Sequence, residues 1–147
     1  MKNNEVTVLG AGLIGSLMSI FLRHQGLDVS IYDKRPDKRK TPYDEGGRSI
    51  NMALSHRGWR SLEKVGLKEK VLPLAIPMYG RSIHDEHGVT TFTPYGVGDQ
   101  AIYSISRGKF NQLLAEEAER LGAKFFFDHK STYTDFKTQE ITFETVD

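Results

Sequence analysis

Apolar residues near the start of the chain predict a strand, a helix and a second strand in close succession. Residues 6–9 are mostly apolar, and they lead into a Gly-x-Gly-x-x-Gly turn over residues 10–15. The apolar positions of residues 16–23 suit a buried helix, and residues 28–32 form a second short strand that ends on Asp33. This order of elements predicts a Rossmann-like βαβ unit and hence an α/β fold.

Beyond this unit the hydrophobic period changes from helical to alternating and back again. The alternating part indicates an antiparallel β segment inserted into the βαβ unit, which then resumes with a third strand of the same sheet. The final residues alternate like a strand in the middle of a sheet, so we expect the chain to be the N-terminal part of a longer protein. The predicted elements are a loop over 41–47, a glycine-led stretch over 46–55 that brings backbone close to a ligand, a helix over 56–65 with Ser55 as N-cap and Gly66 as its stop, a helical turn over 67–72, a hairpin of strands 81–85 and 89–93, a strand over 101–106, a helix over 107–121, a strand over 123–127 and a strand over 141–147.

The glycine turn has the residue types that a dinucleotide site needs. Gly10 permits a tight turn out of the strand, Gly12 lets a pyrophosphate approach the backbone, and Gly15 lets the helix pack against the strand. The first N–H groups of the helix point at the phosphates, together with the positive end of the helix dipole. Asp33 has the spacing of an acid that binds ribose hydroxyls and disfavours a 2′-phosphate, so we expect FAD or NAD rather than NADP in this turn. A purely structural glycine turn is the alternative.

Composition and charge argue against several other classes of protein. The 147 residues carry 20 basic and 19 acidic side chains, and a net charge of +1 provides no field that would attract nucleic acid or an anionic membrane. The chain has no cysteine, no signal pattern and no apolar run long enough to span a bilayer, so we expect a cytoplasmic location. The basic cluster over residues 34–40 is interpreted as a solvated loop near the phosphates of a nucleotide.

No side chain stands out as a catalytic nucleophile or as a metal ligand. Among the five histidines the one close pair, His84 and His87, lies at the tip of the predicted hairpin rather than on a helix, so no metal site is expected. The sequence contains neither a Gly-x-Ser-x-Gly elbow nor a Ser-x-x-Lys motif. If the chain belongs to an enzyme, a bound cofactor must carry the chemistry.

The run GRSINMALSHRG over residues 47–58 is more specific than the glycine turn. It resembles the corresponding segment of the kynurenine 3-monooxygenase family of flavin-dependent aromatic hydroxylases, and the resemblance covers essentially the whole chain. It implies FAD as cofactor, NADPH as co-substrate, and hydroxylation of L-kynurenine by dioxygen to 3-hydroxykynurenine, a step of tryptophan degradation and NAD biosynthesis. Further flavin and substrate contacts of the family lie farther along, so we expect the isolated chain to be inactive and to bind FAD poorly. Additional matches are residues 32–37, 76–84, 94–96 and 104–107, with Asn111 shortly after.

The resemblance also implies roles for individual residues. Arg81 corresponds to the residue that binds the substrate carboxylate, and Tyr95 to a hydroxyl donor beside it. Without the resemblance, the first would be interpreted as a strand arginine facing water and the second as a packed turn aromatic. The implied organisation is an FAD-binding domain over 1–147, with the start of a substrate-side β insertion at about 78–106. The implied cofactor contacts are Gly10, Gly12, Leu13, Ile14, Gly15, Tyr32, Asp33 (where the family more often has Glu), Lys34, Arg35, Ala53, Arg107 and Ser131 (where the local pattern departs from the family).

Two other functions stay open at this stage. One is a related flavin hydroxylase of another aromatic acid, which a replacement of Arg81 or Tyr95 would have favoured; neither residue is replaced. The other is a nucleotide-binding module without catalysis, serving in regulation or interaction. A chain that genuinely stops after Asp147 would favour this second alternative.

Overall fold

The computed structural model describes residues 4–37, 39–40 and 51–145. Backbone contacts divide the chain into two compact units, residues 1–48 together with 111–147, and residues 49–110. Each unit is described by itself below. The predicted loop over 41–47 and the glycines at the start of the 46–55 stretch lie outside the described residues.

The first unit is built on a parallel sheet with the strand order β1-β2-β8. Residues pair in register from Glu5 opposite Asp28 to Leu9 opposite Tyr32, and β8 continues the sheet on the far side of β2. The sheet confirms the predicted Rossmann-like strand–helix–strand order and the predicted third strand. The elements of this unit are β1 (Glu5–Leu9), α1 (Leu13–His24), β2 (Asp28–Tyr32), most of α4 (Arg107–Arg120), β8 (Lys124–Phe126), β9 (His129–Asp135) and β10 (Glu140–Thr145).

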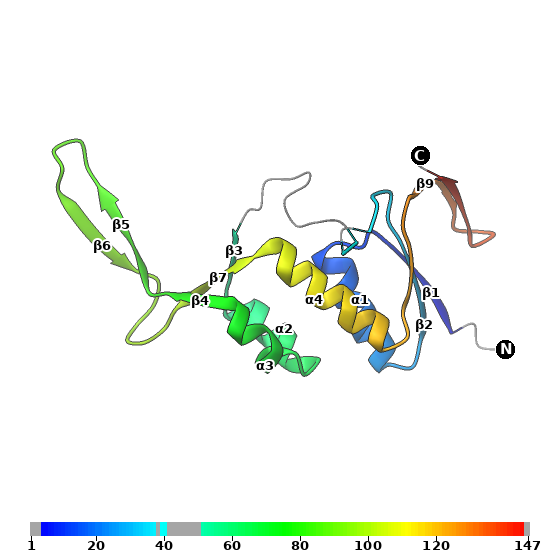
Figure 1. The fold of residues 1–147 in the computed structure, drawn as a ribbon, viewed down its shortest axis with the longest axis horizontal. Coiled ribbons are helices and arrows are strands. Elements are labelled where there is room, and N and C mark those ends of the chain that lie inside the picture. The colour runs from blue at the N-terminus through cyan, green and yellow to red at the C-terminus, as the bar shows by residue number, and fades with distance from the viewer. Residues whose placement is uncertain (1–3, 38, 41–50, 146–147) are drawn as a thin grey trace. The chain divides into compact units, whose positions relative to one another are not determined.

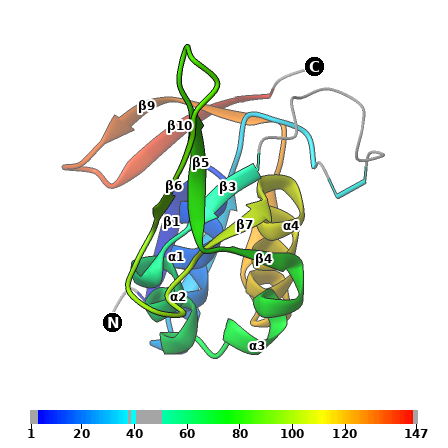
Figure 2. The ribbon, with the colours of Figure 1, turned by 90° about the vertical axis from the view of Figure 1, so that its left-hand side faces the viewer.

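Alternate residues of β2 face two different layers. Val29 and Ile31 are buried on the face that α1 and α4 cover, and the two helices lie side by side in Figures 1 and 2. On the other face, the ring of Tyr32 is stacked between Phe126 and Phe143, with centroid distances of 4.6 and 4.1 Å. The β9–β10 hairpin therefore packs against the sheet through aromatic rings.

The second unit contains the inserted antiparallel segment that the alternating pattern predicted. One sheet has the order β3-β7-β4, and β5 pairs with β6 in a separate hairpin. The short strand β4 was not predicted. The elements are β3 (Asn51–Leu54), α2 (His56–Lys64), α3 (Lys68–Val71), the 3-10 turn η1 (Leu72–Leu74), β4 (Ala75–Met78), β5 (Gly80–His84), β6 (Thr90–Pro94) and β7 (Ile102–Ser106).

Helix α2 follows its predicted amphipathic pattern. Trp59, Leu62 and Val65 are buried, and the Trp59 ring meets the ring of Tyr103 edge-on at 5.1 Å. Gly66 ends the helix with a φ of +71°, a conformation that glycine adopts readily. Ser55 occupies the predicted N-cap position, although its side chain makes no capping hydrogen bond.

The C-terminal strand does not lie in the middle of a sheet, as its alternating pattern predicted. The alternating residues form β10, which pairs antiparallel with β9 in a two-stranded sheet rather than in the middle of a larger one. Strand β9 was not predicted, because most of its residues are polar and exposed. In the described part of the chain, no helix is both long enough and apolar enough to cross a membrane.

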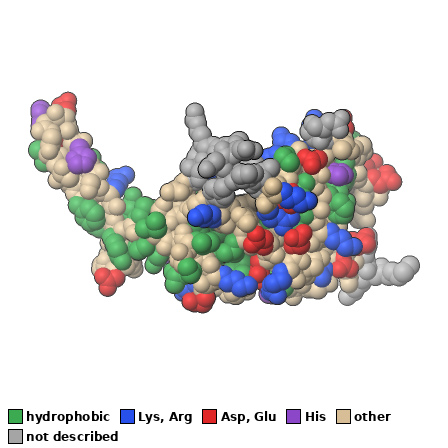
Figure 3. All heavy atoms as spheres, in the orientation of Figure 1, with side chains coloured by type: hydrophobic (Ala, Val, Ile, Leu, Met, Phe, Trp, Pro, Cys, Tyr) green, Lys and Arg blue, Asp and Glu red, His purple; other side chains and the backbone are tan. Residues whose placement is uncertain are grey.

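The β5–β6 hairpin exposes side chains on both of its faces. Nearly all of its residues are exposed, and apolar side chains gather along it and toward its base (Figure 3). Two strands with no further cover bury little apolar surface, and such hairpins are marginally stable on their own. Exposed large apolar residues here include Tyr79, Ile83, Val89, Phe92 and Tyr95.

The side chain of Arg23 joins three chain segments of the first unit. Its Nε donates to the carbonyl of Leu121 at 2.8 Å. Its Nη1 donates to the carbonyl of Leu27 and to the carboxylate of Asp28, both at 2.7 Å. The end of α1, the start of β2 and the end of α4 are therefore linked by one half-buried guanidinium.

We expect Arg23→Met to lower the free energy of unfolding by roughly 1.5–3 kcal/mol, because charge-assisted hydrogen bonds are lost and buried carbonyls lose their donor. Urea unfolding followed by circular dichroism measures the difference. The control is Lys68→Met, since Lys68 pairs with Glu63 at the surface, where the two side chains are 45% and 46% exposed. Its loss of stability should be clearly smaller than that of Arg23→Met, and equal losses in the two variants would contradict the role given to Arg23.

Candidate nucleotide site

The glycine turn connects β1 to α1 with a conformation that the sequence dictates. Gly10 has a φ of +103°, which residues with a Cβ rarely adopt, and its N–H donates to the carbonyl of Tyr32 at 2.7 Å. Gly12 is the N-cap of α1, and the first helical bond runs from the Ser16 N–H to the Gly12 carbonyl at 2.9 Å. The turn thus leaves β1 and enters α1 within three residues.

Gly12 and Gly15 differ in what surrounds them. A Cβ on Gly15 would lie 1.9 Å from the carbonyl oxygen of Gly10, so only glycine allows the helix to pack this closely on the turn. A Cβ on Gly12 would meet nothing within 4 Å, and the φ of −79° there is ordinary. The protein itself therefore does not require glycine at position 12, whereas a ligand lying against the backbone would.

The start of α1 is suited to an anion. No acidic residue lies in the first turn, and no side chain caps the helix in the described structure. The first N–H groups of a helix have no acceptor within the helix, and the helix dipole places partial positive charge at this end. Of the other predicted contacts here, Leu13 is half-buried and Ile14 is 81% exposed.

Asp33 lies beside this turn and is only 5% exposed. Its Oδ2 accepts hydrogen bonds from the Ala11 N–H and from Nη2 of Arg35, both at 2.7 Å. Its Oδ1 accepts from the N–H and from Nε of Arg35, both at 2.9 Å. Burial of the carboxyl opposes its charge, but the hydrogen bonds from Arg35 and Ala11 and the charge of Arg35 outweigh burial and lower the pKa from 3.8 to about 2.

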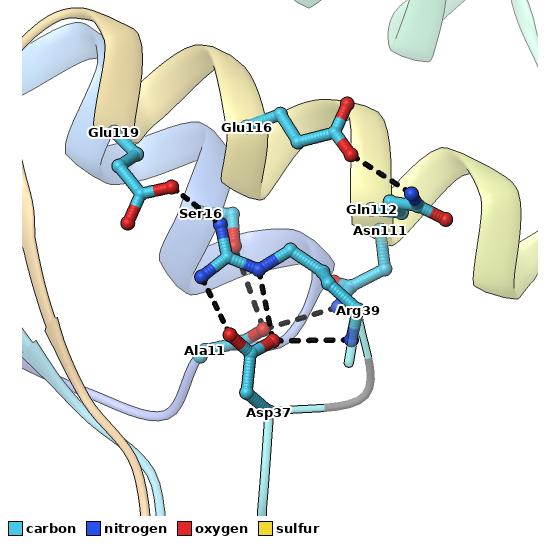
Figure 4. A network of polar contacts seen from close by, with 8 residues as sticks. All are labelled: Ala11, Ser16, Asp37, Arg39, Asn111, Gln112, Glu116 and Glu119. Carbon is cyan, nitrogen blue, oxygen red and sulfur yellow. Dashed lines mark hydrogen bonds and ion pairs between the residues drawn. The ribbon is translucent and has the colours of Figure 1, made fainter. Parts of the chain in front are cut away.

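The basic cluster after β2 is only partly the solvated loop that the sequence indicated. Lys34 is exposed, and so is the Arg35 side chain, at 53%. Arg39, in contrast, binds both oxygens of Asp37, pairs with Glu119 on α4 (Figure 4) and is only 16% exposed. This second arginine is thus a structural link between the loop and α4.

Tyr32 lies in the aromatic layer between the sheet and the β9–β10 hairpin, and Ser131 lies on β9 of that hairpin. Both faces of the Tyr32 ring are covered by Phe126 and Phe143, and His129 meets its edge at 5.9 Å. Ser131 is exposed on β9 and pairs with Phe143. Any contact of Tyr32 with a ligand is therefore limited to its ring edge, its hydroxyl or its backbone.

The remaining predicted residues belong to the second unit. Ala53 on β3 pairs with Ser104 of β7, and Arg107 begins α4 directly after β7; both are exposed. Arg81 on β5 pairs with Thr93 of β6. Just after the end of β6, the N–H of Tyr95 donates to the carbonyl of Tyr79 at 2.9 Å.

Both predicted substrate residues lie near the base of the hairpin in this unit. Arg81 is exposed on β5, and Tyr95, which is 43% exposed, directly follows β6 and is hydrogen-bonded to Tyr79, two residues before Arg81. Among the described residues, no hydrogen bond or ion pair engages the Arg81 guanidinium. That guanidinium is therefore available to a ligand.

Sequence similarity to characterised proteins decides the family. Residues 3–146 match the FAD binding domain family. The chain belongs to this FAD-binding family. It is 48% identical over 130 residues to the kynurenine 3-monooxygenase of Cytophaga hutchinsonii, covering 87% of the chain and 29% of that protein. It is 44% identical over 143 residues to that of Myxococcus xanthus, covering 96% of the chain and 31% of that protein.

The family assignment confirms the expected fold class and FAD as cofactor. The chain spans about 30% of the length of the curated relatives that it matches. A crystal structure of 2-methyl-3-hydroxypyridine-5-carboxylic acid oxygenase superposes with a TM-score of 0.77, covering 99% of this chain and 37% of that one, at 20% identity. At this identity the likeness concerns the fold alone.

The residues of the first unit fit the FAD of this family. The start of α1 offers N–H groups without a competing acid, and the open space at Gly12 lets a pyrophosphate approach the backbone. A buried carboxylate, Asp33, lies at the end of β2, where an acid can accept ribose hydroxyls. In addition, the Oδ1 atom of Asn111 is buried without a hydrogen-bond partner beside the turn, a residue that the sequence did not single out for this site.

Gly12→Ala and Gly15→Ala should affect different properties of the FAD-binding domain. For Gly15→Ala we expect destabilisation by about 1–3 kcal/mol or more, because the new Cβ overlaps the Gly10 carbonyl. For Gly12→Ala we expect a change in stability below about 1 kcal/mol, but FAD affinity weaker on the order of tenfold. Urea unfolding and a flavin fluorescence titration separate the two effects. Normal FAD affinity in Gly12→Ala would contradict the prediction that the pyrophosphate lies close to the backbone of this residue.

Asp33 should make stability depend on pH in the acid range. Because its folded pKa of about 2 lies below the ordinary 3.8, its ionised form stabilises the fold fully above that value, and this contribution is lost as the pH falls from 3.8 toward 2. Asp33→Asn should lower the free energy of unfolding by roughly 1.5–3 kcal/mol at neutral pH. Its stability should then decline less than that of the wild type between about pH 4 and about pH 2.

Urea unfolding at several pH values provides the test, with Asp99→Asn in an exposed turn as the control that keeps the wild-type slope. Parallel stability curves for the wild type and Asp33→Asn would contradict the lowered pKa.

Proposed function

We propose that this chain is the FAD-binding part of an NADPH- and FAD-dependent monooxygenase that hydroxylates L-kynurenine. The reaction consumes L-kynurenine, NADPH, a proton and dioxygen, and yields 3-hydroxykynurenine, NADP⁺ and water. Relatives that carry the name kynurenine 3-monooxygenase, at 48% and 44% identity, support this assignment. A cytoplasmic location and small-molecule partners without nucleic acid are parts of the same proposal.

The first unit would hold the adenosine and pyrophosphate parts of the cofactor. Bound FAD, once reduced by NADPH, supplies the electrons that activate dioxygen for insertion into an aromatic ring. The backbone of the glycine turn would bind the pyrophosphate, and Asp33 would accept the adenosine ribose hydroxyls. With this turn assigned to FAD, NADPH would bind elsewhere. The other proposed contacts are Leu13, Ile14, Tyr32, Lys34, Arg35, Ala53, Arg107 and Ser131.

The placing of Arg81 and Tyr95 near one another at the base of the β5–β6 hairpin is the observation that carries the substrate assignment. A guanidinium is a planar, permanently charged fork that binds a carboxylate through two parallel hydrogen bonds. Arg81 is exposed and unengaged among the described residues, and the partly exposed Tyr95 offers a hydroxyl from the residue that directly follows β6. An amino acid such as L-kynurenine presents the carboxylate that this pair would bind. The proposal thereby assigns residues 78–106 to the start of a substrate-side insertion.

The first experiment measures NADPH oxidation by the protein from its complete reading frame, with and without L-kynurenine. We expect L-kynurenine to stimulate oxidation and to yield a product heavier by one oxygen atom. If L-kynurenine does not stimulate NADPH oxidation although FAD is bound, kynurenine is excluded as the substrate. Another aromatic acid is then the alternative. Failure to oxidise NADPH with any aromatic acid would favour a nucleotide-binding module without catalysis.

Variants of the hairpin then test the substrate contacts. Arg81→Ala should raise the KM for L-kynurenine by about tenfold to a hundredfold, because a charge-assisted pair is lost. Tyr95→Phe should raise it by about fivefold, the effect of one neutral hydrogen bond. The control Arg60→Ala removes an exposed arginine on α2 and should leave KM unchanged. An unchanged KM in Arg81→Ala would contradict carboxylate binding by this residue.

A further inference from the structure

Helix α4 contributes one side chain, Asn111, to the glycine turn. Its Nδ2 donates a hydrogen bond to the carbonyl of Ala11 at 3.2 Å, although the two residues lie 100 positions apart. The hydroxyl of Ser16 donates to the same carbonyl at 3.4 Å, and Figure 4 shows both side chains meeting there. A residue that is remote in the sequence therefore helps to set the conformation of the turn.

The backbone N–H of Ala11 is also fixed by a hydrogen bond. It donates to the buried carboxylate of Asp33 at 2.7 Å. Ala11 directly precedes Gly12, the N-cap, so the orientation of its backbone sets the direction of the N–H groups that follow. Donors that are fixed in advance bind an anion more tightly than donors that must first be ordered.

The second polar atom of Asn111 has no partner. Its Oδ1 is buried without a hydrogen bond. The amide cannot be turned around to relieve this, because two acceptors, Oδ1 and the Ala11 carbonyl, would then face each other. A buried unpaired acceptor destabilises a fold relative to an apolar side chain of similar shape. Fold stability therefore does not account for an asparagine here, whereas control of the Ala11 carbonyl does.

We propose that Asn111 is a positioning residue of the FAD site. It acts through Ala11, by holding the glycine turn in the conformation that receives the pyrophosphate. The inference rests on FAD binding, which the family establishes, and does not depend on L-kynurenine as the substrate. If L-kynurenine failed to stimulate NADPH oxidation, that result would not contradict the role proposed for Asn111.

Three substitutions in the protein from its complete reading frame test the proposal. Asn111→Leu removes both the donor and the unpaired oxygen, Asn111→Asp keeps the shape but lacks the donor, and Asn111→Gln keeps the donor. A flavin fluorescence titration gives the FAD affinity, and thermal unfolding of the FAD-free protein gives its midpoint. We expect the Leu and Asp variants to bind FAD more weakly on the order of tenfold and the Gln variant to recover part of the loss. The midpoint of the FAD-free Leu variant should stay within about 3 °C of the wild type.

Two neighbouring residues supply matched controls. Ser16→Ala removes the other, longer hydrogen bond to the Ala11 carbonyl and should weaken FAD binding less than Asn111→Leu does. Gln112→Ala changes the next residue of α4, whose side chain bonds to Glu116, and should leave FAD affinity unchanged. Unchanged affinity in Asn111→Leu would overturn the proposal. So would a loss of affinity matched by a large fall in the midpoint of the FAD-free protein, since that result would mark a purely structural role.

Discussion

A buried carboxylate needs hydrogen-bond donors, and the donors of Asp33 come from separate parts of the first unit. The side chain binds the glycine turn at Ala11 and the loop after β2 at Arg35. The backbone of Asp33 donates to Phe126 of β8 and accepts from His129 of β9, both at 3.0 Å. The glycine turn, the parallel sheet and the β9–β10 hairpin are therefore linked through Asp33, and the surrounding hydrogen-bond donors stabilise the charge of this residue.

Helices and strands with a regular spacing of hydrophobic residues could be predicted from the sequence. The helices of both units and the three parallel strands agree with their predicted positions within a few residues. Strand β4 was missed because it contains Pro77 and lies at a sheet edge, where a proline is tolerated and alternation is weak. Strand β10 was recognised, but its partner was not, because β9 is mostly polar and becomes a strand only through pairing.

Some residues of the candidate site could be predicted from local sequence spacing, whereas others depend on the packing of distant segments. The glycine turn and Asp33 could be predicted, because their spacing within the βαβ unit follows from the reach of a strand and a helix. The contact of Asn111 with Ala11 could not, since it depends on how α4 packs against a turn that lies 100 positions earlier in the sequence. Tyr32 was expected beside a ribose, yet its ring faces are covered by residues whose positions only the fold determines.

The ribose role proposed for Asp33 places a condition on Arg35. A carboxylate offers about four acceptor positions, and Ala11 and Arg35 already supply four donors to Asp33. Two of these are backbone N–H groups that the turns hold in place, so they cannot leave without disrupting the turns. The other two belong to a guanidinium whose side chain is 53% exposed, and they mimic the paired hydroxyls of a ribose. A nucleotide that binds Asp33 through both hydroxyls must therefore displace the Arg35 side chain, whereas Arg39, bound to Asp37 and Glu119, is held in place.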